Sequence, residues 1–157
     1  MQIHLITVGK LKEKWLRDAY DEYDKRLQRY CRLTRIELPE ARLSESPSDA
    51  EITAALRQEG QAILNACRGK MIALCIEGKL HSSEQFAEML ENAAVSGDST
   101  VSFIIGSSFG LADEVKKKAD IHFSISPMTF THQIARVLLM EQLYRAFQIN
   151  TGGKYHK

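Results

Sequence analysis

The fold follows from one stretch of the sequence, Val101-Ser102-Phe103-Ile104-Ile105-Gly106-Ser107-Ser108-Phe109-Gly110-Leu111. Its first half is almost uniformly apolar, which is typical of a strand buried on both faces of a sheet. The glycine-rich turn that follows leads into a helix start, where an α/β protein usually holds a ligand. A second loop, Ser126-Pro127-Met128-Thr129-Phe130-Thr131-His132, comes one element later. These two loops are therefore the first candidates for a ligand site.

The rest of the chain alternates short apolar strands with amphipathic helices. Strands are expected at residues 2–8, 33–38, 71–76, 101–105 and 121–125. Helices are expected over about 11–30, 48–68, 82–94, 111–118 and 131–147, with a turn at Gly97-Asp98. Ser48 or Asp49 and Ser82 or Ser83 are the candidate N-caps of two of these helices. The alternation predicts an α/β fold with a mainly parallel sheet covered by helices on both faces, in a single domain over residues 1–157.

Two of the predicted helices raise a question of burial. The helix at 131–147 is apolar nearly all round, so we expect its own sheet to cover one side and a second subunit another. In the helix at 48–68, Glu59 lies near the apolar face. It is either a buried functional acid or, as we expect because carboxylates are rarely buried, a solvated residue at the edge of that face.

The composition is that of an ordinary globular protein, with 44% apolar and 26% charged residues. A formal net charge of +1 provides no overall attraction to nucleic acid, so RNA binding requires a local basic patch. Residues 10–35 carry nine Lys or Arg against five Asp or Glu, an excess of four positive charges. This run is either such a patch or a set of solvated helix faces.

Cysteine and histidine spacing argues against metal and disulfides. The three cysteines, Cys31, Cys67 and Cys75, contain no C-x-x-C pair, and the five histidines show no metal-ligand spacing. The N-terminus lacks the features of a signal peptide, and no run of apolar residues is long enough to cross a membrane. We therefore expect a cytoplasmic protein without metal or membrane contact.

The turn at 106–110 also matches the pattern G-x-S-x-G of serine hydrolases. Ser108 would be the nucleophile, and Asp120 and His132 follow in the order of a hydrolase triad. Against this alternative, the chain is short for such a fold and has no HGGG-type stretch for an oxyanion hole. The turn lacks G-x-G-x-x-G and a Walker lysine, so dinucleotide and triphosphate binding are weaker alternatives still.

Two histidines are candidates for a catalytic role. His132 opens the apolar helix beside the second loop, where the positive end of the helix disfavours the protonated imidazole. His156 lies in a polar C-terminal tail beside Tyr155. Either side chain can act as a general base near neutral pH.

Short motifs spread over the whole chain resemble the ribosomal RNA large subunit methyltransferase H family. They are Val8-Gly9-Lys10, Glu59-Gly60, Leu74 to Lys79, Ile105 to Leu111, Met128 to Arg136, Tyr144-Arg145-Ala146 and Tyr155-His156. The resemblance implies a small SPOUT-class enzyme with a trefoil knot in its C-terminal half, which composition would never suggest. It also implies that the enzyme acts as a homodimer on assembled ribosomes, transferring a methyl group from S-adenosylmethionine to N3 of a pseudouridine in large-subunit (23S) ribosomal RNA.

The resemblance places the cofactor at the two loops. Carried over by position, the cofactor-binding residues are Leu74, Gly106, Ile125, Ser126, Pro127, Met128, Thr129 and Phe130. Two residues depart from the usual family pattern. Ser107 stands where a second glycine is usual, and would weaken cofactor binding if that position required a positive φ. Thr131 stands where proline is usual, and can cap the helix that proline would start.

The catalytic residues are also expected from the resemblance and the chemistry. The imide N–H of the target base must lose its proton, and His156 is the first candidate to accept it or to orient the base, with Tyr155 stacking or hydrogen-bonding beside it and His132 as the second candidate. Arg136 and Arg145 are candidates for contacts to phosphate or to the developing anion. The short tail is expected to complete the pocket of the neighbouring subunit.

Two alternatives to the methyltransferase remain open. The first is a knotted RNA-binding protein that has lost catalysis, for which Ser107 is the motive. The second is the serine hydrolase built on Ser108. Titration with S-adenosylmethionine separates both from a methyltransferase.

Overall fold

The computed structural model describes residues 1–97 and 100–157, and the predicted turn at Gly97-Asp98 lies partly outside them. The described residues form a five-stranded sheet with the order β2-β1-β4-β3-β5, in which every neighbouring pair is parallel. Its strands are β1 (Gln2–Val8), β2 (Arg32–Leu38), β3 (Lys70–Leu80), β4 (Thr100–Ile105) and β5 (Ile121–Ser124). The predicted parallel α/β sheet is confirmed.

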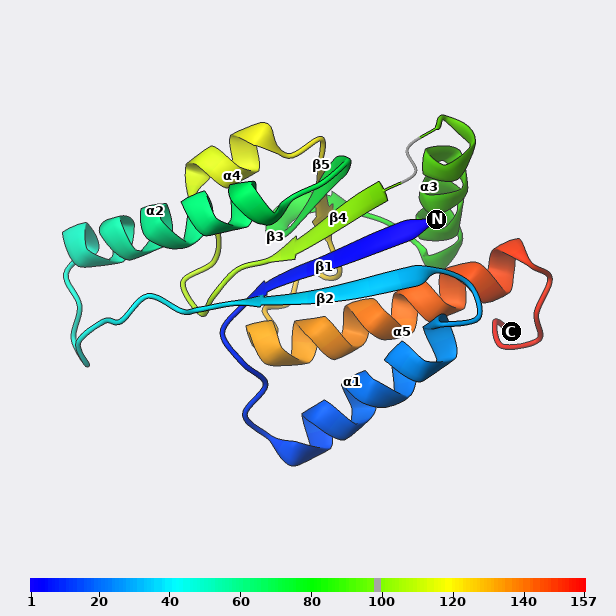
Figure 1. Ribbon diagram of the computed structural model, residues 1–157, viewed down its shortest axis with the longest axis horizontal. Helices are drawn as coiled ribbons and strands as arrows, with labels where there is room; N and C mark the ends of the chain where they lie inside the picture. The colour runs from blue at the N-terminus through cyan, green and yellow to red at the C-terminus, as the bar shows by residue number, and fades with distance from the viewer. Residues whose placement is uncertain (98–99) are drawn as a thin grey trace.

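Helices cover both faces of this sheet, as predicted (Figure 1). The five helices of the described residues are α1 (Lys14–Leu27), α2 (Asp49–Ala66), α3 (Ser83–Val95), α4 (Asp113–Lys118) and α5 (His132–Asn150). Helices α1, α3 and α5 share one hydrophobic core with one face of the sheet, and α2 and α4 share a smaller core with the other. None of these described helices is long and apolar enough to span a membrane.

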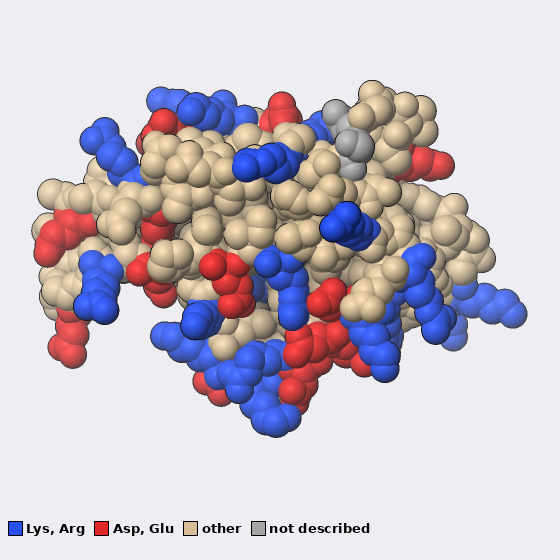
Figure 2. Space-filling model, in the orientation of Figure 1, with Lys and Arg blue, Asp and Glu red and all other residues tan. Residues whose placement is uncertain are grey.

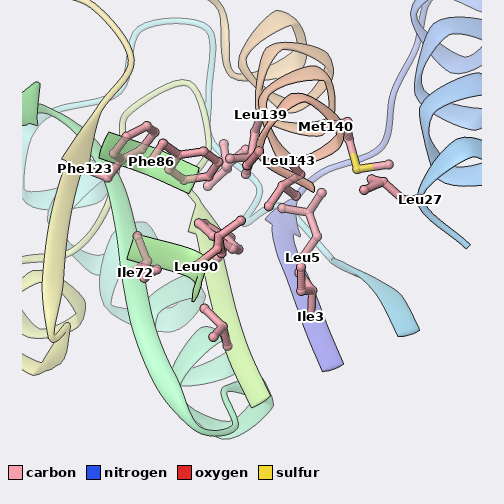
Figure 3. Packing of buried hydrophobic residues seen from close by; sticks show 14 of the residues in the cluster. Ile3, Leu5, Leu27, Ile72, Phe86, Leu90, Phe123, Leu139, Met140 and Leu143 are labelled. Atoms are coloured by element: carbon pink, nitrogen blue, oxygen red, sulfur yellow. The ribbon is translucent and has the colours of Figure 1, made fainter. Parts of the chain in front are cut away.

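The larger core packs α5 and α3 against the central strands (Figure 3). Leu139 and Leu143 of α5 and Phe86 of α3 are fully buried, with Leu143 beside Leu5 of β1. The rings of Phe86 and Phe123 stack with their centroids 5.0 Å apart. This apolar layer holds the middle of α5 against the sheet.

Local sequence signals account for most helix starts. Ser48 and Ser82 both form capping boxes, in which the side-chain oxygen accepts from the N3 amide and the N3 side chain reaches back. Thr131 caps α5, because its Oγ1 accepts a hydrogen bond from the Ile134 amide at 3.2 Å. The predicted capping role of Thr131 is therefore confirmed.

Strand β3 is the element that departs furthest from its predicted bounds. It was expected to end at Ile76 but continues to Leu80, and its pairing with β5 shifts between Leu74 and Lys79. Gly78 permits this close pairing, since a Cβ there would lie 2.7 Å from the carbonyl carbon of Phe123. The irregular segment lies beside the pocket described next.

Candidate active site

A pocket of about 940 Å³ opens where the carboxyl ends of β3, β4 and β5 meet the starts of α1 and α5. This is the edge at which parallel α/β sheets bind ligands. Seven of the eight residues predicted to bind a cofactor line it, namely Leu74, Gly106, Ile125, Ser126, Met128, Thr129 and Phe130. Pro127 is not among the lining residues. The two loops that the sequence singled out are therefore walls of one pocket.

The first loop, residues 106–110, is tightly closed. The Gly110 amide donates to the Ser107 carbonyl at 2.9 Å, and Gly110 has a φ of +86°. A Cβ at Gly106 would lie only 2.0 Å from the Gly110 carbonyl oxygen. Glycine is therefore required at 106 by the close approach and at 110 by the backbone conformation.

Ser107 does not carry the strain that would weaken ligand binding. Among the described residues, no residue other than glycine has a positive φ. Ser107 is instead buried, at 5% exposure, and its Oγ donates to Glu59 Oε2 at 2.9 Å. The extra side chain thus has a hydrogen-bond partner rather than an unfavourable backbone.

The expectation that Glu59 is solvated was wrong. Glu59 is 5% exposed, and its second oxygen, Oε1, accepts from the Ala41 amide at 3.0 Å. A buried carboxylate is tolerated when donors satisfy its oxygens, and here both have one. The donors lie 18 and 48 residues away in sequence, so helical periodicity could not reveal them.

The second loop presents backbone groups and apolar side chains to the pocket. Ser126 organises the turn, because its Oγ accepts from the Met128 amide at 3.0 Å and its carbonyl accepts from Ser124 Oγ at 3.0 Å. Met128 and Phe130 are 73% and 41% exposed at the rim. Such a combination suits a ligand with a flat ring and polar edges.

His132 lines the same pocket at the first position of α5. Its pKa is lowered from 6.5, first by burial and then by the positive charges of Arg136 and Lys12, while Glu40 acts in the opposite direction. The direction agrees with the prediction, but burial is the leading cause rather than the helix end. At neutral pH the imidazole is uncharged and able to accept a proton.

Arg136 lies one turn further along α5 and has no exposed surface. Its Nη2 donates to the carbonyl oxygens of Val8 and Gly9, and Nη1 lies 3.5 Å from Glu37 Oε1. Burial lowers the pKa of this guanidinium. A side chain enclosed in this way cannot reach a phosphate, so the predicted phosphate contact by Arg136 does not fit its position.

The tail residues lie away from the pocket of their own chain. His156 Nε2 is 2.8 Å from Glu84 Oε1 at the start of α3, and its Nδ1 is 3.4 Å from Arg145 Nη1. Tyr155 donates from its hydroxyl to Glu141 Oε1 at 3.1 Å. None of these described side chains lines the pocket.

The predicted catalytic residues thus form two groups. His132 stands at the pocket, whereas Arg145, Tyr155 and His156 gather near the far end of α5. With a rise of 1.5 Å per residue, positions 132 and 145 are about 20 Å apart along the helix. Arg145 is held by Glu141, and burial is the leading cause that raises the pKa of Tyr155.

The residues proposed for a hydrolase triad do not come together. Ser108 is exposed, and Asp120 Oδ2 accepts instead from the Met71 amide at 2.7 Å. Within residues 1–97 and 100–157, no hydrogen bond joins Ser108, Asp120 and His132. The same part of the chain contains no group of three or more His, Cys, Asp or Glu side chains placed to hold a metal ion.

Two features of the pocket were not predicted. One is the rim formed by Lys12, Glu13 and Trp15 at the start of α1, where Trp15 is 61% exposed. The other is an ion pair between Lys116 and Glu77, which joins α4 to β3 and lowers the pKa of Glu77 through its hydrogen bond. The first could have been inferred, because β1 ends at the same sheet edge as β4.

Comparison with known proteins identifies close relatives. Residues 1–156 match a family model described as predicted SPOUT methyltransferase. The chain is 50% identical to the ribosomal RNA large subunit methyltransferase H of Streptococcus thermophilus (strain CNRZ 1066), over the full length of both chains. It is 46% identical to the ribosomal RNA large subunit methyltransferase H 1 of Clostridium perfringens (strain SM101), again over both full lengths.

Solved structures of lower identity share the fold. A probable methyltransferase from Bordetella pertussis Tohama I superposes with a TM-score of 0.56 at 14% identity, covering 92% of this chain and 95% of that one. A probable methylase family protein from Haemophilus influenzae Rd KW20 has a TM-score of 0.55 at 14% identity, covering 99% and 70%. At this identity the likeness concerns the architecture alone.

Proposed function

The chain belongs to the SPOUT methyltransferase family, and from that premise we propose that it methylates N3 of a pseudouridine in 23S ribosomal RNA with S-adenosylmethionine as the methyl donor. The observation that carries the proposal is the convergence of the loops at 105–111 and 125–130 on one pocket at the strand ends. Relatives named for ribosomal RNA methylation, aligned over their full length, support RNA as the substrate.

The pocket residues fit this cofactor. Gly106 lines the pocket, and because it has no Cβ the loop can close against the Gly110 carbonyl and form a compact wall of the pocket. Ile125, Met128 and Phe130 supply an apolar enclosure for the adenine ring. When bound, S-adenosylmethionine supplies an electrophilic methyl group. The contribution of the protein is to hold both reactants in one orientation, which accounts for a large share of such rate accelerations.

The active site is proposed to be composite, formed by a homodimer. One chain offers the pocket with His132, and the partner offers its tail with Tyr155, His156 and Arg145. The separation of these two groups along α5 supports this arrangement. So do the exposed apolar side chains at the pocket rim, Trp15 and Met128, which a second subunit would cover.

In this composite site His156 accepts the imide proton at a ring nitrogen or orients the base edge. Tyr155 packs beside it, and its ring lies 4.9 Å from that of Tyr144 within one chain. Arg145 is placed to stabilise the developing imide anion, since its guanidinium contacts both Glu141 and the His156 ring. His132, neutral and on the pocket wall, is the second candidate for the base.

The remaining parts of the proposal concern topology and the substrate. The C-terminal half is proposed to carry the trefoil knot of the SPOUT class, and the whole chain to form one domain in the cytoplasm. The target is proposed to be the assembled ribosome, because a chain with a net charge of +1 must rely on shape and on a local basic patch.

The basic patch is proposed to lie on and around α1. Three of its cations are neutralised by ion pairs, Lys14 with Asp18, Arg26 with Glu22, and Arg35 with Asp21. The cations without an ion pair among the described residues are Lys10, Lys12, Arg17, Lys25, Arg29 and Arg32. Figure 2 shows Lys and Arg side chains interspersed with Asp and Glu along the lower edge of the molecule, where α1 lies.

Methyl transfer from tritiated S-adenosylmethionine tests the proposal on whole ribosomes, isolated large subunits and naked RNA. We expect incorporation into ribosomes, with mass spectrometry mapping the label to N3 of a pseudouridine. His156→Ala should abolish transfer while leaving the calorimetric Kd for S-adenosylmethionine near that of the wild type. Absence of cofactor binding by the wild type would leave only an RNA-binding protein.

Mixed dimers test the composite site. A subunit with His156→Ala and a subunit with Gly106→Ala each lack one half of a site. If the site is shared between chains, mixing the two inactive proteins restores up to about a quarter of the wild-type rate, because half of the dimers are mixed and each has one intact site. No recovery after verified subunit exchange would place the tail in its own chain's site.

A further inference from the structure

We propose that Glu59 is a positioning residue for the cofactor loop, and that Ser107 is the donor through which it acts. This inference rests on the function proposed above. The Glu59 carboxylate lies on α2 and does not line the pocket. Among the described residues, its hydrogen bonds are to Ser107 and to the Ala41 amide, and none is to Ile105 or to the second loop. Its effect on the ligand therefore passes through the shape of the loop at 106–110.

The two carboxylate oxygens bind the segments that follow two different strands, β4 and β2. Oε2 accepts from Ser107 Oγ at 2.9 Å, just after β4, and Oε1 accepts from the Ala41 amide at 3.0 Å, just after β2. Because each oxygen has its own donor, the carboxylate cannot rotate without losing one of them. Ser107 is thereby held against a group that is itself fixed.

Ser107 transmits this restraint to the rest of the loop. Its carbonyl accepts from the Gly110 amide, and the neighbouring Gly106 makes the closest backbone approach of the loop, to the Gly110 carbonyl. Displacement of Ser107 would therefore move the glycines that face the pocket. An ordinary glycine at 107 could not make the side-chain bond to Glu59.

The residue after Glu59 packs against the start of α4, the helix that follows the loop. A Cβ at Gly60 would lie 3.1 Å from Ala112 Cβ and 3.2 Å from Val115 Cγ2, so α2 and the start of α4 pack closely at this point. Glu59 thus anchors the beginning of the segment 107–115, and Gly60 permits the packing that anchors its end. Glu59 and Gly60 together therefore restrain the cofactor loop from the side of α2.

A double-mutant cycle in cofactor binding tests the inference. Ser107→Ala and Glu59→Gln should each raise the calorimetric Kd for S-adenosylmethionine roughly 10-fold, the size expected for loss of one charge-assisted hydrogen bond. Glu59→Gln keeps the shape of the side chain but removes the negative charge that strengthens the bond to Ser107. The double variant should bind no more weakly than the poorer single variant, since both changes act on the same contact. At saturating cofactor the kcat should stay within about twofold of the wild type, because the catalytic groups are untouched.

Glu51→Gln is the matched control. Glu51 lies on the same helix in an exposed capping box, so its loss should lower thermal stability without changing the Kd for the cofactor. Wild-type affinity in Ser107→Ala, or additive effects in the double variant, would overturn the positioning role. A wild-type protein that does not bind S-adenosylmethionine would overturn the proposed function, and the inference with it.

Discussion

Arg136 donates a hydrogen bond to the carbonyl oxygen of Gly9 at 3.0 Å, from a guanidinium with no exposed surface. Gly9 follows β1, and Arg136 lies in the second turn of α5, so the bond joins the first strand to the last helix. The same side chain also donates to the Val8 carbonyl. Arg136, a candidate from the sequence for contacts to phosphate or to the developing anion, makes these hydrogen bonds inside the protein, next to the pocket.

Replacing Arg136 with Met should destabilise the fold by about 3 kcal/mol or more, because two buried carbonyls lose their donor. Urea unfolding monitored by circular dichroism measures the change. Arg145→Met is the matched control on the same helix, since Arg145 is a quarter exposed and its ion pair with Glu141 should contribute about 1 kcal/mol or less. Equal losses in the two variants would contradict the supporting role of Arg136.

Gly106→Ala should abolish measurable binding of S-adenosylmethionine, because the new Cβ would collide with the Gly110 carbonyl and reshape the loop. Gly69→Ala provides the control, since its Cβ would lie 1.9 Å from the Thr100 carbonyl, at a turn outside the pocket. Both variants should lose stability, but at a temperature where both are folded only Gly106→Ala should fail in calorimetric titration. Normal binding by Gly106→Ala would show that the loop does not shape the site.

Stability should fall as the pH drops from about 7 toward 5. The pKa values of His132 and His4 are both lowered from 6.5, so the unfolded chain binds protons before the folded one does. Their contribution is fully present above pH 6.5 and is lost as the pH falls through that value to the lowered pKa. His132→Gln should make the urea midpoint less dependent on pH over this range, and an unchanged pH slope would contradict a half-buried, neutral His132.

The tail should loosen when Glu141 is neutralised. Glu141 Oε1 accepts from both Arg145 and Tyr155, so Glu141→Gln weakens the two contacts that hold the tail on α5. Carboxypeptidase digestion followed by mass spectrometry should show faster removal of the last residues. Glu22→Gln breaks a comparable ion pair with Arg26 on α1 and should leave the digestion rate unchanged. A similar rate in all three proteins would show that Glu141 does not hold the tail.

Much of the architecture was predictable because local patterns encode it. The apolar run at 101–105 and the period of the helices predicted the order of elements, and Ser48, Ser82 and Thr131 marked helix starts through side-chain capping. The parallel arrangement then required the loops after β4 and β5 to meet at one edge. The sequence by itself therefore determined the fold class and the position of the pocket.

Only the tertiary structure decided which polar side chains are buried and what they hold. Glu59 binds donors 18 and 48 residues away, and Arg136 reaches a carbonyl 127 residues away. The separation of His132 from His156 likewise depends on how the tail folds back along α5. Periodicity reports which face of a helix is apolar, but burial of a charge depends on whether distant backbone and side-chain groups satisfy it, and those partners are fixed only when the chain is packed.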